Sequence, residues 1–172
     1  MKKIIYMLVS IMMISVISTL NVFAMPYNPN LYTSVNQVSE LLPPERKQSK
    51  VTESAKTRGD FFLSADLTIM NNGDGTIGAL AVALAAVPVD EAYITIYLDQ
   101  WDKEAERWRQ VKYYDAEFYS KDYPEGLTTP KVSLTFTDQP SGYYYRLRGA
   151  FSMMYNGKFE GFSPVTDGIL LD

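Results

Sequence analysis

Along much of the chain, apolar and polar residues alternate one by one, which is the pattern of half-buried β-strands. The first such run holds Leu63, Ala65, Leu67 and Ile69 on its apolar face. Similar runs follow, separated by turn residues. The predicted strands cover residues 61–70, 76–86, 92–101, 108–119, 131–137, 143–155 and 159–162, with a further extended stretch at 165–171. Because no 3.6-residue pattern of useful length lies between them, we expect an all-β fold.

Short connections join these predicted strands and favour antiparallel pairing. The segments 71–75 (Asn-Asn-Gly-Asp-Gly) and 156–157 (Asn-Gly) supply residues that tolerate positive φ, and Asn-Gly is a strong hairpin signal. Residues 76–86 are almost continuously apolar, so we expect that strand to lie centrally, and their alanines indicate close approach to a facing sheet. About seven strands at this spacing predict an antiparallel two-sheet sandwich over residues 59–172, with a small barrel as the alternative.

The first residues follow a different pattern. Two lysines precede an apolar run over residues 4–20, and the short side chain of Ala24 precedes Met25. This is the pattern of a secretory signal peptide over residues 1–24, cleaved between Ala24 and Met25. The alternative is an uncleaved membrane anchor, because the run approaches the roughly 20 apolar residues that span a bilayer.

Residues 25–58 contain few large apolar side chains. Such a composition cannot bury enough surface to offset the entropy of ordering the chain. We therefore expect a flexible spacer or a propeptide before the sandwich. For part of this range the alternative is one short amphipathic turn at residues 35–42, ended by Pro43.

The chain contains no cysteine and no histidine, and its net charge is −4 at pH 7. The absence of cysteine excludes disulfides, thiol catalysis and thiolate metal sites, and without histidine the usual general base and zinc ligand are missing. We expect no cofactor and no metal site. The acidic balance argues against a nucleic-acid partner. With the signal peptide, these features predict a secreted, extracellular protein of a Gram-positive bacterium, without stable membrane insertion after signal removal.

One segment, residues 139–149 (Gln-Pro-Ser-Gly-Tyr-Tyr-Tyr-Arg-Leu-Arg-Gly), resembles the corner that leads into strand F of fibronectin type III and immunoglobulin-like sandwiches. The resemblance implies that Tyr143 is the corner tyrosine, whose hydroxyl bonds back to the preceding loop. Residues 97–111 resemble the C–C′ hairpin of that family, and residues 163–165 resemble its last strand. The tryptophan usual in strand B of fibronectin modules is missing from residues 76–86.

The chain is also similar to a clostridial family of small secreted proteins whose domain has no known function. The similarity lies in Leu98 and Trp108, in residues 142–149 and in residues 165–169. It implies the same sandwich architecture and adds no activity.

Acidic residues cluster in and around the predicted hairpin at 92–119. They are Asp99, Asp102, Glu104, Glu106, Asp115 and Glu117. A glycosidase needs two carboxylates roughly 5 to 9 Å apart across a cleft, but these residues interleave with lysines and arginines, as on a solvated hairpin. We therefore predict no catalytic residues and no enzyme, with a carboxylate-based hydrolase as the most distant alternative.

Two short motifs suggest ligands but have simpler interpretations. Residues 72–75 (Asn-Gly-Asp-Gly) are similar to part of a calcium loop but lack its spaced acidic residues, so we interpret them as a turn. Residues 58–60 (Arg-Gly-Asp) resemble the integrin-binding tripeptide, and such a short match often arises by chance.

The 13 tyrosines suggest a binding surface. If Ile94, Ile96, Tyr145 and Leu147 point inward, alternation places another set of residues on the opposite, exposed face. This set, the Tyr/Arg face, is Tyr93, Tyr97, Tyr144, Arg146 and Arg148. Lys112 and Tyr114 would join it if Val111 and Tyr113 point inward. Tyrosine and arginine are enriched at recognition surfaces, and the alternative is that these cross-strand pairs merely stabilise an exposed sheet.

Together these features predict a secreted, non-catalytic binding or interaction module whose partner is an unknown protein or glycan at the cell exterior. The alternative function is that of a carbohydrate-binding accessory protein, acting on glycans or the cell wall.

Overall fold

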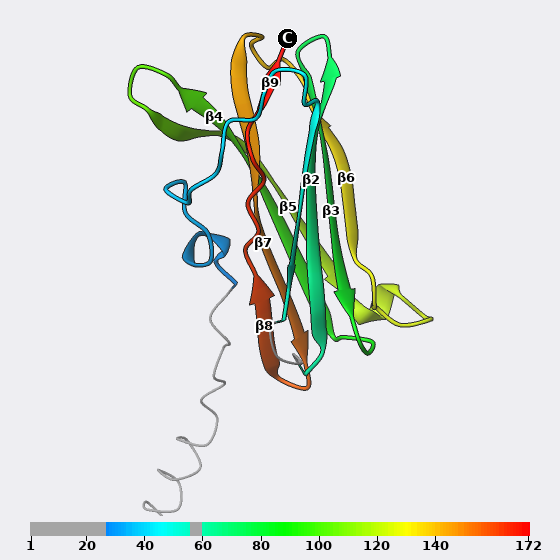
Figure 1. Cartoon of the computed structure of the whole chain (residues 1–172). Helices are drawn as coiled ribbons and strands as arrows, with labels where there is room; N and C mark the ends of the chain where they lie inside the picture. Colours follow the sequence, from blue (N-terminus) through cyan, green and yellow to red (C-terminus); the bar gives the residue numbers. More distant parts are fainter. Residues whose placement is uncertain (1–26, 56–59) are drawn as a thin grey trace, which may run out of the picture.

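The computed structural model describes residues 27–55 and 60–172, and this part of the chain folds into nine β-strands in two antiparallel sheets that pack face to face (Figure 1). The predicted two-sheet sandwich is confirmed. The predicted signal peptide, with its cleavage between Ala24 and Met25, lies outside the described residues. None of the helices in the described ranges is both long and apolar enough to cross a membrane.

The first sheet has the strand order β1-β2-β3-β6, and the second has the order β5-β4-β7-β8, with β9 also paired to β7. The strands of the first sheet are β1 (Gln48–Ser54), β2 (Phe62–Gly73), β3 (Thr76–Ala85) and β6 (Lys131–Phe136). The strands of the second are β4 (Glu91–Asp102), β5 (Arg107–Tyr119), β7 (Tyr143–Tyr155), β8 (Lys158–Phe162) and β9 (Ile169–Leu171). Two short 3₁₀ turns, η1 (Pro29–Leu31) and η2 (Ser120–Asp122), lie outside the sheets.

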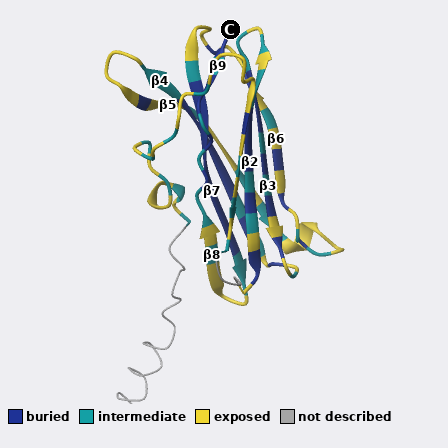
Figure 2. Cartoon of the chain, in the orientation of Figure 1, coloured by how far each residue is buried: buried dark blue, intermediate teal, exposed yellow. Residues whose placement is uncertain are grey.

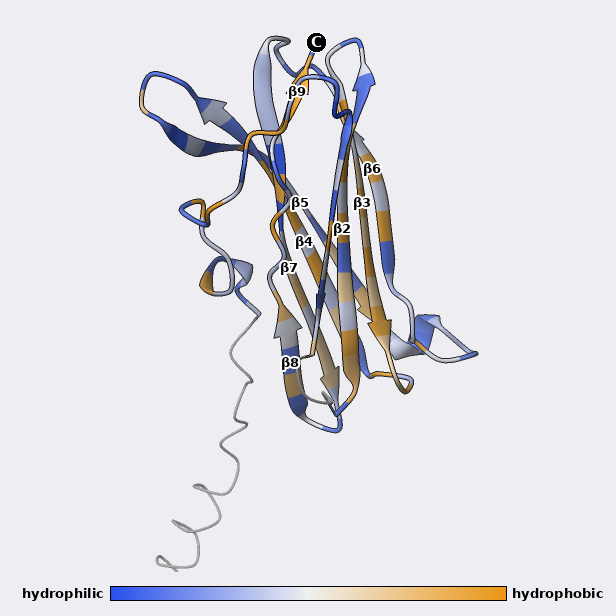
Figure 3. Ribbon diagram, in the orientation of Figure 1, coloured by the Kyte–Doolittle hydropathy of each residue, from blue (hydrophilic) through white to orange (hydrophobic). Residues whose placement is uncertain are grey.

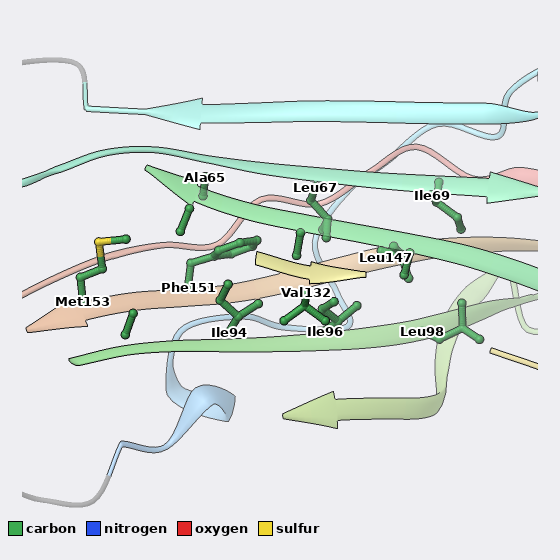
Figure 4. Packing of buried hydrophobic residues seen from close by; sticks show 14 of the residues in the cluster. Ala65, Leu67, Ile69, Ile94, Ile96, Leu98, Val132, Leu147, Phe151 and Met153 are labelled. Atoms are coloured by element: carbon green, nitrogen blue, oxygen red, sulfur yellow. The ribbon is translucent and has the colours of Figure 1, made fainter. Parts of the chain in front are cut away.

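The hydrophobic core fills the space between the two sheets (Figure 4). Buried positions run along the middle of the strands, whereas the hairpin ends are exposed and hydrophilic (Figures 2 and 3). The predicted inward residues of β4 and β7 are buried, and so are Ala65, Leu67 and Ile69 of β2. Leu63 is the exception, at 39% exposure, because the register shifts between Phe62 and Ser64.

Strand β3 lies between β2 and β6, which confirms its predicted internal position. Its alanines Ala79, Ala81 and Ala83 are buried against the facing sheet. Small side chains here leave room for larger ones from the second sheet, such as Phe151 and Leu147 (Figure 4).

The flexible spacer predicted for residues 25–58 has to be corrected wherever the structure describes that range. Gln48–Ser54 forms β1 and pairs with β2 from Gln48 opposite Met70 to Ser54 opposite Ser64. An edge strand is held largely by its backbone ladder, so it needs few large apolar side chains. Composition alone therefore underestimated the order of this segment.

The tyrosine whose hydroxyl bonds back to the preceding loop lies two residues after the predicted one. The hydroxyl of Tyr145, not that of Tyr143, donates a hydrogen bond to the carbonyl of Pro140 at 2.9 Å. It also accepts one from the side-chain amide of Gln100 at 2.7 Å. Tyr143 is 47% exposed at the start of β7, whereas Tyr145 points into the core and lies close enough to the loop to make this bond.

Candidate functional site

The Tyr/Arg face lies on the side of the second sheet that points away from the core, as alternation predicted. Strand pairing sets Tyr97 opposite Arg148 and Asp99 opposite Arg146 across β4 and β7. Its predicted exposure, however, is wrong for three of the five residues, since Tyr97, Arg146 and Arg148 are 3%, 0% and 3% exposed. Tyr93 and Tyr144 stay partly exposed at its two ends.

A segment that we name the strap, residues 27–42, covers this face (Figure 1). At its start, the Tyr27 hydroxyl donates to the Ala150 carbonyl at 3.1 Å. Further along, the Tyr97 hydroxyl donates to Oδ1 of Asn30 at 2.8 Å. At its end, the Leu42 backbone N–H donates to the Gly168 carbonyl at 2.9 Å. Hydrogen bonds along its whole length therefore attach the strap to the sheet.

A buried charge cluster lies beneath the strap. Both oxygens of Asp99, which is 0% exposed, accept from the Arg148 guanidinium, at 2.7 and 3.1 Å. Oδ2 also accepts from Nε of Arg146 at 3.1 Å. Burial lowers the pKa of the Arg146 guanidinium, and the Asp99 carboxylate opposes that shift. One carboxylate thus compensates two buried cations, so the cluster depends on Asp99 more than on either arginine.

Arg146 joins this cluster to the strap. Its terminal nitrogens donate to the carbonyls of Gln37 at 2.6 Å and Val35 at 2.7 Å, and to the Ser39 hydroxyl at 2.8 Å. Its guanidinium also stacks over the Trp108 ring, 4.5 Å from the ring centroid. The side chain predicted to reach an external ligand instead binds the chain's own backbone.

The register of β5 differs from the arrangement that would add Lys112 and Tyr114 to the Tyr/Arg face. Lys112 pairs with Leu98 and Tyr114 with Ile96, so both point to the core side of the sheet. Tyr113 pairs with Tyr97 and lies on the outer face, where it is 61% exposed. The register shifts between Leu98 and Asp99 and leaves one extra residue on β5. This bulge reverses which residues of β5 point to the core side of the sheet and which to the outer side.

The β4–β5 hairpin extends beyond the sandwich (Figure 1). The last residue of β4 that pairs with β7 is Gln100, and beyond it Trp101 pairs only with Trp108 of β5. The two tryptophan rings meet edge to face, with centroids 5.2 Å apart. The hairpin end is therefore separated from β7 on one side and faces the strap on the other.

Trp101 lines two hollows, which share no other lining residue. The first, about 280 Å³, lies between the hairpin and the strap, and its lining includes Asn36, Glu106 and Arg107 together with buried Trp108. The second, about 260 Å³, lies between the hairpin and the start of β7. Its lining consists of Trp101, Leu41, Lys103, Gly142, Tyr143 and Tyr144. We name the two hollows together the strap–hairpin cleft.

Sequence reasoning missed this cleft, although it identified Tyr144 on its rim. The sequence did contain one signal for the aromatic pair. Trp101 and Trp108 lie on either side of a short predicted hairpin, where residues on adjacent strands come into contact. No periodic pattern could indicate the strap, which supplies one wall with irregular backbone.

Asp102 and Asp115, two of the acidic hairpin residues, are held by other groups. Asp102 forms an ion pair with Arg109, and the backbone N–H of Ala105 lowers the pKa of its carboxyl. Asp115 accepts a hydrogen bond from the Thr95 hydroxyl at 2.7 Å. Over the described ranges, histidine, cysteine, aspartate and glutamate side chains do not gather in threes at any point that could hold a metal.

The two short motifs have ordinary surroundings where they are described. Gly73, Asp74 and Gly75 adopt positive φ in the turn between β2 and β3, as a tight hairpin requires. Asp60 forms an exposed ion pair with Lys158 at 2.8 Å, and the preceding Arg-Gly lies outside the described residues.

No family model matches the chain, and no curated protein is significantly similar to it. The similarity to a clostridial family therefore stays a prediction.

Proposed function

We propose that this protein is a secreted, non-catalytic binding module and that its ligand occupies the strap–hairpin cleft. The main support for this proposal is the position of Trp101, a half-buried aromatic side chain that lines both hollows. Large aromatic side chains supply much of the binding energy of recognition surfaces at a small entropic cost. The cleft replaces the Tyr/Arg face as the candidate surface, and Tyr144 belongs to both.

The surroundings of Asp99 and Asp102 argue against a catalytic role for these two carboxylates. A hydrolase of this composition would need a carboxyl group that retains its proton near neutral pH. Asp99 is completely buried between two guanidinium groups, and the hydrogen bonds of Asp102 hold its pKa below the ordinary value. Asp99 is therefore out of reach of a substrate, and Asp102 is not suited to donate a proton to one.

The extracellular location and the finer fold assignment belong to the same proposal. The strands that the fibronectin-like resemblance assigns to C, C′ and F are β4, β5 and β7, and they share one sheet. The Tyr145–Pro140 bond is the type of contact that a tyrosine corner makes. Both features favour a fibronectin type III-like module, a scaffold that presents loops and hairpins to partners.

The proposal is tested by probing the purified protein against a mixed array of glycans and peptides. The unmodified protein should bind at least one class of probe, and Trp101→Ala should weaken that binding by roughly tenfold or more, as expected for a tryptophan at the centre of an interface. Tyr113→Ala is the matched control, because Tyr113 is an exposed aromatic residue of β5 outside the cleft. It should leave binding unchanged.

Circular dichroism and the urea midpoint establish that each variant keeps its fold. Binding that survives Trp101→Ala but is lost in Tyr113→Ala would move the site to the β5 surface and overturn the proposed cleft. The absence of binding to any probe would also count against the proposed function.

A further inference from the structure

We propose that the ligand of the strap–hairpin cleft is an oligosaccharide chain that lies across Trp101, with one sugar ring in each hollow. This inference rests on the proposed function and names the class of ligand. The starting point is that two hollows of similar size, about 280 and 260 Å³, share a single lining residue, Trp101. A linear polymer of rings joined by narrow linkages fits such a divided site.

The floor of the cleft offers the surface that sugar rings prefer. A pyranose ring carries C–H groups on its faces, and these pack favourably against the negative face of an aromatic ring. Trp101 makes an edge-to-face contact with Trp108, and Trp108 in turn lies against the Arg146 guanidinium. The aromatic side chain is therefore held in place before a ligand arrives, which reduces the entropic cost of binding.

The rim of the cleft suits hydroxyl groups, each of which can both donate and accept a hydrogen bond. The lining of the first hollow includes Asn36, Glu106 and Arg107, whose side chains carry an amide, a carboxylate and a guanidinium, and all three residues are exposed. The second has the hydroxyls of Tyr143 and Tyr144 and the exposed ammonium of Lys103. Each hollow thus combines polar groups with the shared aromatic floor, as small-molecule sites generally do.

An extended peptide fits the first hollow less well. Sheet-like binding of a peptide depends on backbone groups that are still unpaired. The strap carbonyls of Val35 and Gln37 already accept hydrogen bonds from buried Arg146. The wall therefore presents side chains more than backbone, which favours hydroxyl recognition over strand addition.

The test uses the intrinsic fluorescence of the protein. The chain has two tryptophans in all, and both of them, Trp101 and Trp108, line the first hollow. In the folded protein, their emission therefore responds to a ligand in the cleft. Chito-, cello- and xylo-oligosaccharides of one to six units are titrated as probes, together with unstructured peptides of similar length.

For at least one sugar series, affinity should rise by roughly tenfold or more between the monosaccharide and the two- or three-unit probes and then level off. Two exposed variants separate the hollows by calorimetry. Asn36→Ala should weaken binding of both short and long probes, whereas Tyr143→Ala should reduce the gain from the second unit. Trp101→Phe retains a ring and should bind more tightly than Trp101→Ala.

Three results would overturn this inference. Affinity that is independent of chain length would remove the two-ring arrangement. Binding that is insensitive to Asn36→Ala and Tyr143→Ala would place the sugar elsewhere. Tight binding of peptides, lost in Trp101→Ala and without any response to the sugars, would refute the oligosaccharide while leaving the proposed binding function intact.

Discussion

The most direct test of the buried charge cluster is Asp99→Asn. The substitution keeps the size of the side chain but removes the negative charge that two arginines share. Asp99 is 0% exposed, so water cannot replace the lost charge. Removing one partner of a buried ion pair typically costs about 3–5 kcal/mol. Because two guanidinium groups lose their compensation here, we expect a cost well inside that range, about 4 kcal/mol.

Urea denaturation monitored by tryptophan fluorescence measures this cost. A loss of about 4 kcal/mol lowers the midpoint by about 2 M when the urea dependence is about 2 kcal/mol per molar. A stability of about 5–15 kcal/mol is usual for a domain, so the variant should still be folded in water. The control is Asp60→Asn, which removes an ion pair whose side chains are 66% and 67% exposed and should not shift the midpoint measurably.

The loss should also be visible in the strap. Arg146 without its carboxylate partner is expected to hold the carbonyls of Val35 and Gln37 less firmly. Amide hydrogen exchange of residues 33–42 should therefore accelerate more in Asp99→Asn than exchange in the core strands of the first sheet. A midpoint shift below about 0.5 M, or unchanged exchange in the strap, would refute the idea that this cluster holds the strap.

Two further predictions concern tyrosines. Tyr145→Phe removes the hydroxyl that bonds to Pro140 and Gln100, and it should lower the free energy of unfolding in urea by about 1 kcal/mol. Tyr143→Phe should have no measurable effect. Equal effects of the two substitutions would contradict the assignment of the loop contact to Tyr145. Burial raises the pKa of Tyr27 from 10.0 to about 12, so its contribution to stability is complete below pH 10.0 and is lost as the pH rises through about 12. Urea midpoints measured across that range should fall less steeply for Tyr27→Phe than for the unmodified protein.

The sandwich was predictable because burial of one sheet face imposes a period of two on the sequence. At two positions where prediction failed, a local irregularity had changed that period. The shift beside Leu63 turns one apolar side chain outward, and the bulge in β5 reverses the faces of Lys112 and Tyr113. A bulge adds one residue to one strand without a clear compositional signal. Residues beyond it still alternate between the two faces of the sheet, but each lies on the face opposite to the predicted one.

The exposure of the Tyr/Arg face could not be predicted from alternation. An antiparallel sheet commonly has one face in the core and one in water, and the polar outer residues of β4 and β7 agreed with that pattern. The pattern does not show whether another segment covers the polar face. Here Asp99, Arg146 and Arg148 bind one another and the polar backbone of the strap. A polar sheet face buried under irregular chain therefore resembles a solvated face in sequence.

The same contacts make the fold and the candidate site interdependent. The strap forms one wall of the first hollow, Trp108 lies in its floor, and Arg146 binds both. A ligand that contacts this wall can bind only molecules in which the strap is docked. It must therefore stabilise the docked strap by RT ln(1 + [L]/Kd), where [L] is the concentration of free ligand. Loss of Arg146 should weaken ligand binding without removing any group that the ligand touches, because part of the binding energy must then order the strap.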